Sequence, residues 1–431
     1  MLGEIVRDHA PFHAAHVTFS TFGGALGRSA LRENAILAAI SGPFNMMTLL
    51  IPLYLSHLGY PVGVVGAVVA LGGVSSLASR FPVPKLYRPE RSRALIFASL
   101  GAAIPTCAVM PFLPDIRAFM VMFVLNRIFV GLATTFFLAR YLDLLVAGAD
   151  RRQAMGWYGG TQAFGYTTSN VLVGLLADYV GYPAAFFYGV VFCALGIALL
   201  VGAPELHPRP KPATSGAAGG RTSLVRAIGD PGLWSVVNVG FWNNLFHLVL
   251  SSFFPVFGAA VGLGPAEVGL TRGLYSFINA IGRPSLAALI RRLTLRQVNY
   301  LGLVAQMGLM AALPAAPAFA VILGIFTLFA ASRALVVVSN SAGLAEEVDD
   351  TRVSRGVATS VFSATSDVSN IVAPLAAGLI ASATGIKGMF PIVALGAFGC
   401  YVAGDLTIQR WRASARIERS TIATPDPRPS T

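Results

Sequence analysis

The feature that most constrains this chain is a series of apolar windows, each long enough to cross a lipid bilayer as a helix. Such a helix needs about 20 mostly apolar residues. Six windows lie in the first half of the sequence, at about 35–57, 62–80, 94–113, 118–142, 154–177 and 184–203. Six more lie in the second half, at about 232–258, 266–290, 297–314, 318–343, 357–383 and 389–408. Because unpaired backbone groups are costly in hydrocarbon, the windows predict an all-α membrane protein with twelve transmembrane helices.

The composition agrees with this class. Hydrophobic residues make up 55% of the chain and charged residues only 12%, which is more apolar than is usual for a soluble domain. The net charge of +12 could indicate a nucleic-acid-binding surface, but the basic residues lie between the apolar windows and not along one face. We therefore expect the lipid bilayer as a partner and no nucleic acid.

The basic residues also predict how the chain is oriented. Lys and Arg concentrate before the first window, in alternate loops and after the last window, and such segments stay on the cytoplasmic side. With an even number of spans, both termini are expected in the cytoplasm, for a protein of the inner or plasma membrane. The expected segments are a lead (1–33), a six-helix bundle (34–203), a Pro- and Gly-rich linker (204–230), a second bundle (231–410) and a tail (411–431), disordered from Ala413.

The two halves of the sequence resemble each other at fixed spacings. One set of residues recurs after 203 positions, where Pro52, Gly59, Gly66 and Arg80 correspond to Pro255, Gly262, Gly269 and Arg283. A second set recurs after 204 positions, where Gly174, Gly181 and Phe186 correspond to Gly378, Gly385 and Phe390. Two parallel six-helix repeats joined by a linker are one way in which secondary transporters are built.

Three of the charged residues inside apolar windows are candidates for function, because a charge there is costly and indicates function by default. Arg127 and Arg333 are candidate cavity cations that attract an anionic substrate; the alternative for Arg127 is a structural bond to the carbonyls of a neighbouring helix. Asp367 is the only carboxylate near the middle of its window, and we expect it to carry a proton. The alternative for Asp367 is a fixed ion pair with Arg333.

Uncharged polar side chains add further candidates for a substrate cavity. The seventh window is polar in its first half, where Trp242 could stack on a planar substrate and Asn243 and His247 are spaced to share one helix face. Asn45 in the first window is a candidate of the same kind. The alternative for these side chains is hydrogen bonding between helices, which is common in membrane proteins.

No pattern in the sequence supports catalysis or a nucleotide-driven pump. It contains no glycine loop that would cradle phosphates, and no paired-carboxylate, metal-binding or nucleophile constellation. We therefore expect no enzymatic activity, no cofactor and no metal. Transport would have to be driven by a gradient.

The segment Leu125-Asn-Arg127-Ile-Phe-Val-Gly131 resembles the fourth-helix motif of the major facilitator superfamily, and Arg151 to Gly156 is similar to the start of its fifth helix. The resemblance extends from about Asn34 to Trp411. It implies twelve helices in two pseudo-symmetric bundles and alternating access between them. It also implies that the first, fourth, seventh and tenth helices line a central cavity, while the second, fifth, eighth and eleventh form the interface between the halves.

The resemblance further implies that basic loops take part in the conformational change. The residues at these positions are Arg88, Arg91, Arg93, Arg151, Arg152, Arg291 and Arg292. The sequence departs from the family at Arg88, which stands where an aspartate is expected, and in the fifth helix, which lacks the glycine-proline pair common in antiporters.

Together these features predict a monomeric secondary transporter for a small organic anion or zwitterion, working by proton-coupled efflux. Proton-coupled uptake of an organic anion or metabolite is the first alternative. A membrane sensor or assembly factor that uses the same fold without any flux is the second.

Overall fold

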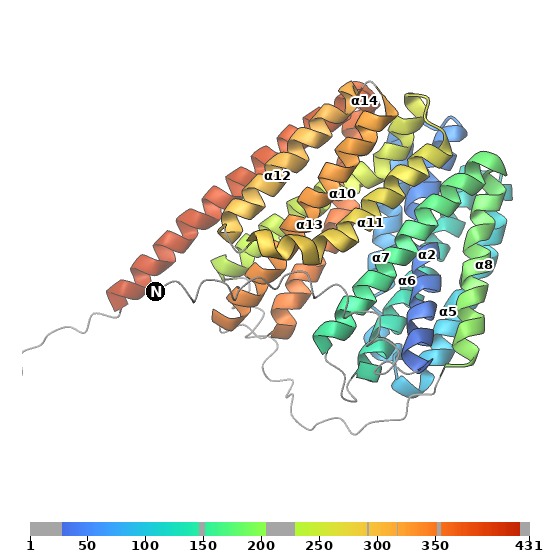
Figure 1. Cartoon of the computed structure of the whole chain (residues 1–431), viewed down its shortest axis with the longest axis horizontal. Coiled ribbons are helices and arrows are strands. Elements are labelled where there is room, and N and C mark those ends of the chain that lie inside the picture. Colours follow the sequence, from blue (N-terminus) through green and yellow to red (C-terminus); the bar gives the residue numbers. More distant parts are fainter. Residues whose placement is uncertain are drawn as a thin grey trace, which may run out of the picture.

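The computed structural model describes residues 28–145, 151–203, 229–290, 293–316, 318–350 and 355–422. Within these ranges every regular element is a helix, which confirms the all-α prediction (Figure 1). Residues 1–27, most of the predicted linker (204–228) and the loop arginines Arg291 and Arg292 lie outside the described residues.

The first half of the chain forms six long helices. These are α2 (Arg28–His57), α3 (Val62–Ala78), α5 (Ser92–Val109), α6 (Ile116–Leu145), α7 (Arg151–Tyr179) and α8 (Tyr182–Val201). Short elements lie between them, namely α4 (Val83–Leu86) and the 3-10 helices η1 (Pro89–Arg91) and η2 (Met110–Phe112).

The second half repeats this arrangement. Its helices are α10 (Pro231–Ala260), α11 (Pro265–Ile290), α12 (Leu295–Ala312), α13 (Phe319–Asp350) and α14 (Arg355–Ile422), with the 3-10 helix η4 (Leu313–Ala315) after α12. Gly385 has a φ of 75° and divides α14 into two helical arms. The described residues of each half therefore form six long helical segments.

Seven of the described helices are long and apolar enough to cross a membrane by length and composition alone. The long helices outside that set are α3, α7, α10 and α11. Of these, α3 packs against α14, and α7 packs against α11, so each buries part of its surface against the other half of the chain. Helix α3 is apolar and falls outside the set because it has 17 residues, whereas α7, covered by α11, needs less apolar surface than a helix that faces lipid all round.

Two predicted boundaries differ from the structure. Helix α2 begins at Arg28, inside the predicted lead, and α14 continues to Ile422, through most of the tail that was expected to be disordered from Ala413. Hydropathy locates only the apolar part of a helix, whereas the helix continues as long as its residues favour it. After Trp411 the chain contains no Gly or Pro until Pro425, so nothing in the sequence stops the last helix earlier.

Four glycines with a left-handed backbone form the turns at one end of the bundle, which we call the turn end. They are Gly59 (φ 78°), Gly181 (φ 108°), Gly262 (φ 86°) and Gly385 (φ 75°). A side chain strains this conformation, which explains why glycine occupies these positions. The four residues are two of the pairs in the sequence repeat, so the repeat is confirmed as equivalent helix turns in the two halves.

The two halves meet along two seams. We call the packing of α3 against α14 the α3–α14 seam and that of α7 against α11 the α7–α11 seam. These are the second, fifth, eighth and eleventh long segments, as the family resemblance implied. Figure 1 shows the ribbons of the two halves closest at the turn end and spread apart at the opposite end.

Glycine pairs allow close approach at both seams. A Cβ atom added to Gly66 would lie 2.8 Å from the Cα of Gly378, and one added to Gly174 would lie 2.8 Å from the Cα of Gly269. Real Cβ atoms do not approach this closely, so only glycine fits. Gly66 corresponds to Gly269 in the repeat, and Gly174 to Gly378. The repeated glycines therefore build two equivalent contacts between the halves.

Candidate functional site

One turn of α2 binds a buried arginine from α6. The Arg127 guanidinium donates a 2.8 Å hydrogen bond from Nη1 to the carbonyl of Phe44 and lies 4.6 Å from the centre of the Phe44 ring. The Arg127 residue is only 8% exposed. The partners of Arg127 in this structure are therefore neutral. The bond to a carbonyl of a neighbouring helix, which was the alternative given in the sequence analysis, is present.

A second buried arginine reaches the same turn of α2 from the other half of the chain. Arg272 of α11 donates from Nη1 to the Thr48 carbonyl (2.8 Å) and from Nη2 to the Thr48 hydroxyl (2.9 Å), and it is 5% exposed. In a helix that carbonyl would accept from the N–H of Pro52, but proline has none. Arg272 therefore supplies the donor that Pro52 cannot.

The sequence analysis missed Arg272 because it was assigned to a helix end, although it lies inside the window that begins at about residue 266. In the structure it lies about two turns inside α11. The missing N–H of Pro52 was the one available signal, because it leaves a carbonyl without its helical donor. The sequence alone does not reveal which distant side chain fills that place.

Amides next to this turn continue the polar contacts between the halves. The Asn45 side chain donates to the Asn170 side chain of α7 (3.0 Å), and Asn170 donates to the hydroxyl of Ser276 on α11 (3.2 Å). Asn45 was a predicted site residue, and the structure places it directly beside the partners of Arg127 and Arg272.

The third cation, Arg333 of α13, lies in a cluster of C-terminal side chains. It donates to the Tyr275 hydroxyl (2.9 Å) and to Oδ1 of Asn244 (3.4 Å). The same hydroxyl is 2.7 Å from Nδ1 of His247, and the Tyr275 and His247 rings stack with centres 5.3 Å apart. The structure therefore brings the predicted residues Arg333 and His247 together. The Nε of Arg333 is buried without a hydrogen-bond partner among the described residues.

The structure does not bring Trp242 and Asn243 into this cluster. Trp242 donates to the Asn238 side chain (2.9 Å), which in turn donates to the Tyr401 carbonyl, and Asn243 accepts from Gln306 of α12 (3.0 Å). Asn243 thus makes a hydrogen bond between α10 and α12, which was the alternative left open, whereas Trp242 bonds within α10. Asn244, next in sequence, is the α10 amide that reaches Arg333.

Asp367 pairs with an arginine from the other half, and not with Arg333. Its Oδ2 lies 2.8 Å from Nη1 of Arg80, just beyond the end of α3, and the Arg80 side chain is 47% exposed. This corrects the alternative in which Arg333 was the partner. The pair crosses the α3–α14 seam, so it links the two halves.

The predicted loop arginines differ in their surroundings. Arg88 and Arg91 are exposed, while Arg93 donates a 3.0 Å hydrogen bond to the Val201 carbonyl. The helix that begins at Arg151 is described, but the side chains of Arg151 and Arg152 are not among the described residues.

A tyrosine in the same loop was not predicted as a contact. The Tyr87 hydroxyl donates a 2.6 Å hydrogen bond to Asp143 at the end of α6, and thereby ties the loop to the bundle. Burial, together with the adjacent Asp143 carboxylate, raises the pKa of the Tyr87 phenol above its ordinary value. The tyrosine therefore stays protonated and acts as a donor.

Arg127, Arg272 and Arg333 have no acidic partner among the described residues. The ion pairs among these residues include Arg80–Asp367, Arg140–Glu33 and Arg296–Asp405. None of the pairs in the described ranges involves Arg127, Arg272 or Arg333. We call these three residues the arginine cluster. Within the same ranges no group of His, Cys, Asp or Glu side chains could hold a metal ion.

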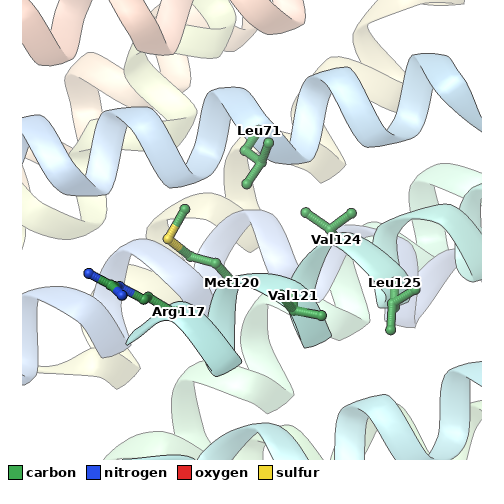
Figure 2. Close-up of a pocket in the computed structure, with 6 residues that line it drawn as sticks. All are labelled: Leu71, Arg117, Met120, Val121, Val124 and Leu125. Carbon is green, nitrogen blue, oxygen red and sulfur yellow. The ribbon is translucent and has the colours of Figure 1, made fainter. Parts of the chain in front are cut away.

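A pocket of about 320 Å³ lies away from these residues, between α3 and the first part of α6. Figure 2 shows Leu71 of α3 facing Met120 and Val124 of α6, with the Arg117 guanidinium at one end. Val121 in its wall is 56% exposed. The pocket contains none of the predicted site residues, and its apolar lining matches a surface that faces lipid.

Comparisons with known proteins agree with this architecture. The sequence model of the Major Facilitator Superfamily matches residues 90–352. No curated protein matches the sequence. Among solved structures, the chain is similar to a bacterial homolog of the human lysosomal transporter Spinster in an inward-facing and unoccupied conformation. That likeness has a TM-score of 0.65 at 12% identity, covering 88% of this chain and 95% of that chain.

A second similar structure is the nucleoside transporter NupG, with a TM-score of 0.64 at 14% identity. It covers 88% of this chain and 98% of that chain. At such low identities the likeness is one of fold, and the substrates of these proteins do not transfer to this chain.

Proposed function

The chain belongs to the major facilitator superfamily and is a secondary transporter, and we propose that it exports a small organic anion, or the anionic group of a zwitterion, in exchange for protons. It works as a monomer by alternating access. The turn end faces away from the cytoplasm of an inner or plasma membrane, because basic residues gather at the opposite end, and both termini are cytoplasmic.

The observation that carries the substrate class is that, among the described residues, Arg127 and Arg333 have no carboxylate partner. Both cations bind neutral groups only, namely a carbonyl, a phenol and an amide. A buried charge without a counter-charge is costly, and such residues in a membrane mark a substrate or ion pathway. A carboxylate makes shorter and stronger hydrogen bonds with guanidinium than a carbonyl does, so an anion would displace these partners.

Proton coupling rests on the position of Asp367. Its ion pair with Arg80 crosses the α3–α14 seam, so the charge state of one carboxylate affects a contact between the halves. Protonation converts the carboxylate into a neutral acid and weakens its bond to Arg80. A proton taken up on one side of the membrane could thus favour separation of this seam, as alternating access requires.

The test is flux in proteoliposomes under an imposed pH gradient, with a panel of organic anions, zwitterions and cations. We expect an anion to move against the proton flow, Asp367→Asn to uncouple that movement from the gradient, and Arg127→Gln to weaken anion binding. Arg117→Gln is the matched control, because it removes an arginine at the pocket of Figure 2, away from the cluster.

The sign of the coupled flux gives the direction, and movement of the anion together with protons would replace export by uptake. Preferential movement of cations would contradict the assignment of the arginines. No flux with any probe, together with variants that behave like the parent, would favour a sensor or assembly role.

A further inference from the structure

Two members of the arginine cluster bind the same face of α2. Arg127 donates to the carbonyl of Phe44 and Arg272 to that of Thr48. These residues are four apart, so their carbonyls lie on one side of the helix and about 6 Å apart along its axis. Arg127 comes from the N-terminal half and Arg272 from the C-terminal half, and one helix turn thus holds a cation from each.

The third member is connected to Arg272 through one turn of α11. Arg333 donates to the hydroxyl of Tyr275, which follows Arg272 by three residues on the same helix. Residues at that spacing are neighbours on the helix surface, about 4.5 Å apart along the axis. The three arginines are therefore linked through one turn of α2 and one turn of α11.

The charges of this cluster are not balanced within the described residues. Asp367, the carboxylate that the sequence suggested as a partner, pairs with Arg80. A buried cation without a counter-charge is costly, and a single negative group would leave most of this charge uncompensated. The buried Nε of Arg333, which has no partner among the described residues, is a further donor for an anion.

We infer that Arg272 is a third anion-binding residue and that the transported anion carries two separate negative groups, as a short dicarboxylate does. One carboxylate binds at Arg127 and the other at Arg272 and Arg333. The spacing of the Phe44 and Thr48 carbonyls favours two groups joined by a short chain, because one carboxylate is too small to replace both. This inference rests on the proposed function and deepens it.

The experiment compares dicarboxylates with their half-amides, which keep the length and lose one charge. Binding to the purified full-length chain is measured by the rise in its apparent unfolding temperature with ligand concentration. We expect each dicarboxylate of suitable length to bind about tenfold more tightly than its half-amide, the factor typical of one charged hydrogen bond. Arg272→Gln should remove most of this preference, and Arg272→Lys should retain part of it.

A second variant keeps the test independent of how well Arg272→Gln folds. Thr48→Val removes one of the two acceptors that compete with the ligand for Arg272, so it should raise dicarboxylate affinity a few-fold. Arg117→Gln should leave the preference intact.

Equal binding of dicarboxylates and half-amides across the panel would overturn the inference while leaving an anion transporter in place. A preference that survives in Arg272→Gln would also overturn it. If only cationic probes bind, the proposed function fails as well.

Discussion

The α3–α14 and α7–α11 seams are equivalent in the repeat, yet they differ in how charge is used. At the turn end both close through glycine pairs, Gly66 with Gly378 and Gly269 with Gly174. Further along, the first seam carries the ion pair of Arg80 and Asp367. The second lies beside the buried Arg272, which binds α2 across the interface through neutral acceptors.

The difference shows what the repeat supplies and what each half adds. A shift of 203 residues maps Arg272 onto Val69 of α3 (272 − 203 = 69), so the first seam has no equivalent cation. The repeat therefore provides small residues at both seams. A single difference between the halves, Arg272 in place of Val69, gives only the α7–α11 seam a buried cation. At the α3–α14 seam the half-exposed Arg80 can exchange its partner for water at low cost, whereas the buried Arg272 cannot.

A buried ion pair inside the N-terminal half provides a reference for the two seams. Breaking it should cause the largest loss of unfolding free energy. Arg140 is fully buried and pairs at 2.7 Å with Glu33, which is also buried. Glu33→Gln leaves a buried cation without its counter-charge, so we expect a loss of about 3–5 kcal/mol in unfolding free energy. Thermal unfolding in detergent measures it, with the exposed Glu90→Gln as control. A loss no larger than that of the control would show that the pair is solvated.

The glycine contacts of the two seams should respond alike. A Cβ at Gly269 would lie 2.5 Å from the Asn170 carbonyl oxygen, and one at Gly66 would lie 2.8 Å from that of Pro374. Both neighbours are backbone atoms, so Gly269→Ala and Gly66→Ala should each lower stability by about 1–3 kcal/mol.

The matched control for these variants is Gly308→Ala on α12, where an added Cβ meets no atom within 4 Å. It should raise stability by up to about 1 kcal/mol, because alanine favours helix over glycine. The same sign at all three positions would mean that the seams are not tightly packed.

The hydrogen bonds from Arg272 to α2 are present only beside the α7–α11 seam, so their contribution to stability tests the difference between the seams. Thr48→Val removes the hydroxyl that accepts from Nη2 of Arg272 in a buried site, so we expect a loss of about 1.5 kcal/mol or more. Thr168→Val is the control, because the Thr168 hydroxyl bonds only to the carbonyl of Phe164, four residues earlier on its own helix. Unfolding of the ligand-free chain reports the difference, and equal losses would mean that Arg272 contributes nothing special to the contact.

The glycines of the turns and seams could be predicted from the sequence because they recur at a constant spacing between the two halves. Gly59 with Gly262, and Gly174 with Gly378, recur at fixed distances whatever their neighbours are. The number and order of the helices came from the apolar windows, and the pairing of helices at the seams from the family resemblance. The repeat itself anticipated the equivalent turns at Gly59 and Gly262.

The partners of the charged residues could not be predicted in this way. The bond from Arg272 to Thr48 joins residues 224 positions apart, and the pair of Arg80 and Asp367 joins residues 287 positions apart. A window of hydropathy shows that a charge is inside a helix but not which helix it faces. Asn243 illustrates the same limit, since its partner Gln306 lies on α12, 63 positions away.

The smallest effect on stability is expected at the ion pair of the α3–α14 seam. Arg80 is about half exposed, so water and salt screen its attraction to Asp367, and Asp367→Asn should cost about 1 kcal/mol or less. A double-mutant cycle with Arg80→Gln measures the coupling energy of the pair, which should fall as salt rises. A coupling energy of several kcal/mol would mean that the pair is as well shielded from water as Arg272 is. We expect a small coupling energy between Arg80 and Asp367, together with loss of proton-driven flux in Asp367→Asn. That result would mean that the α3–α14 seam opens during transport, while the α7–α11 side holds the anion.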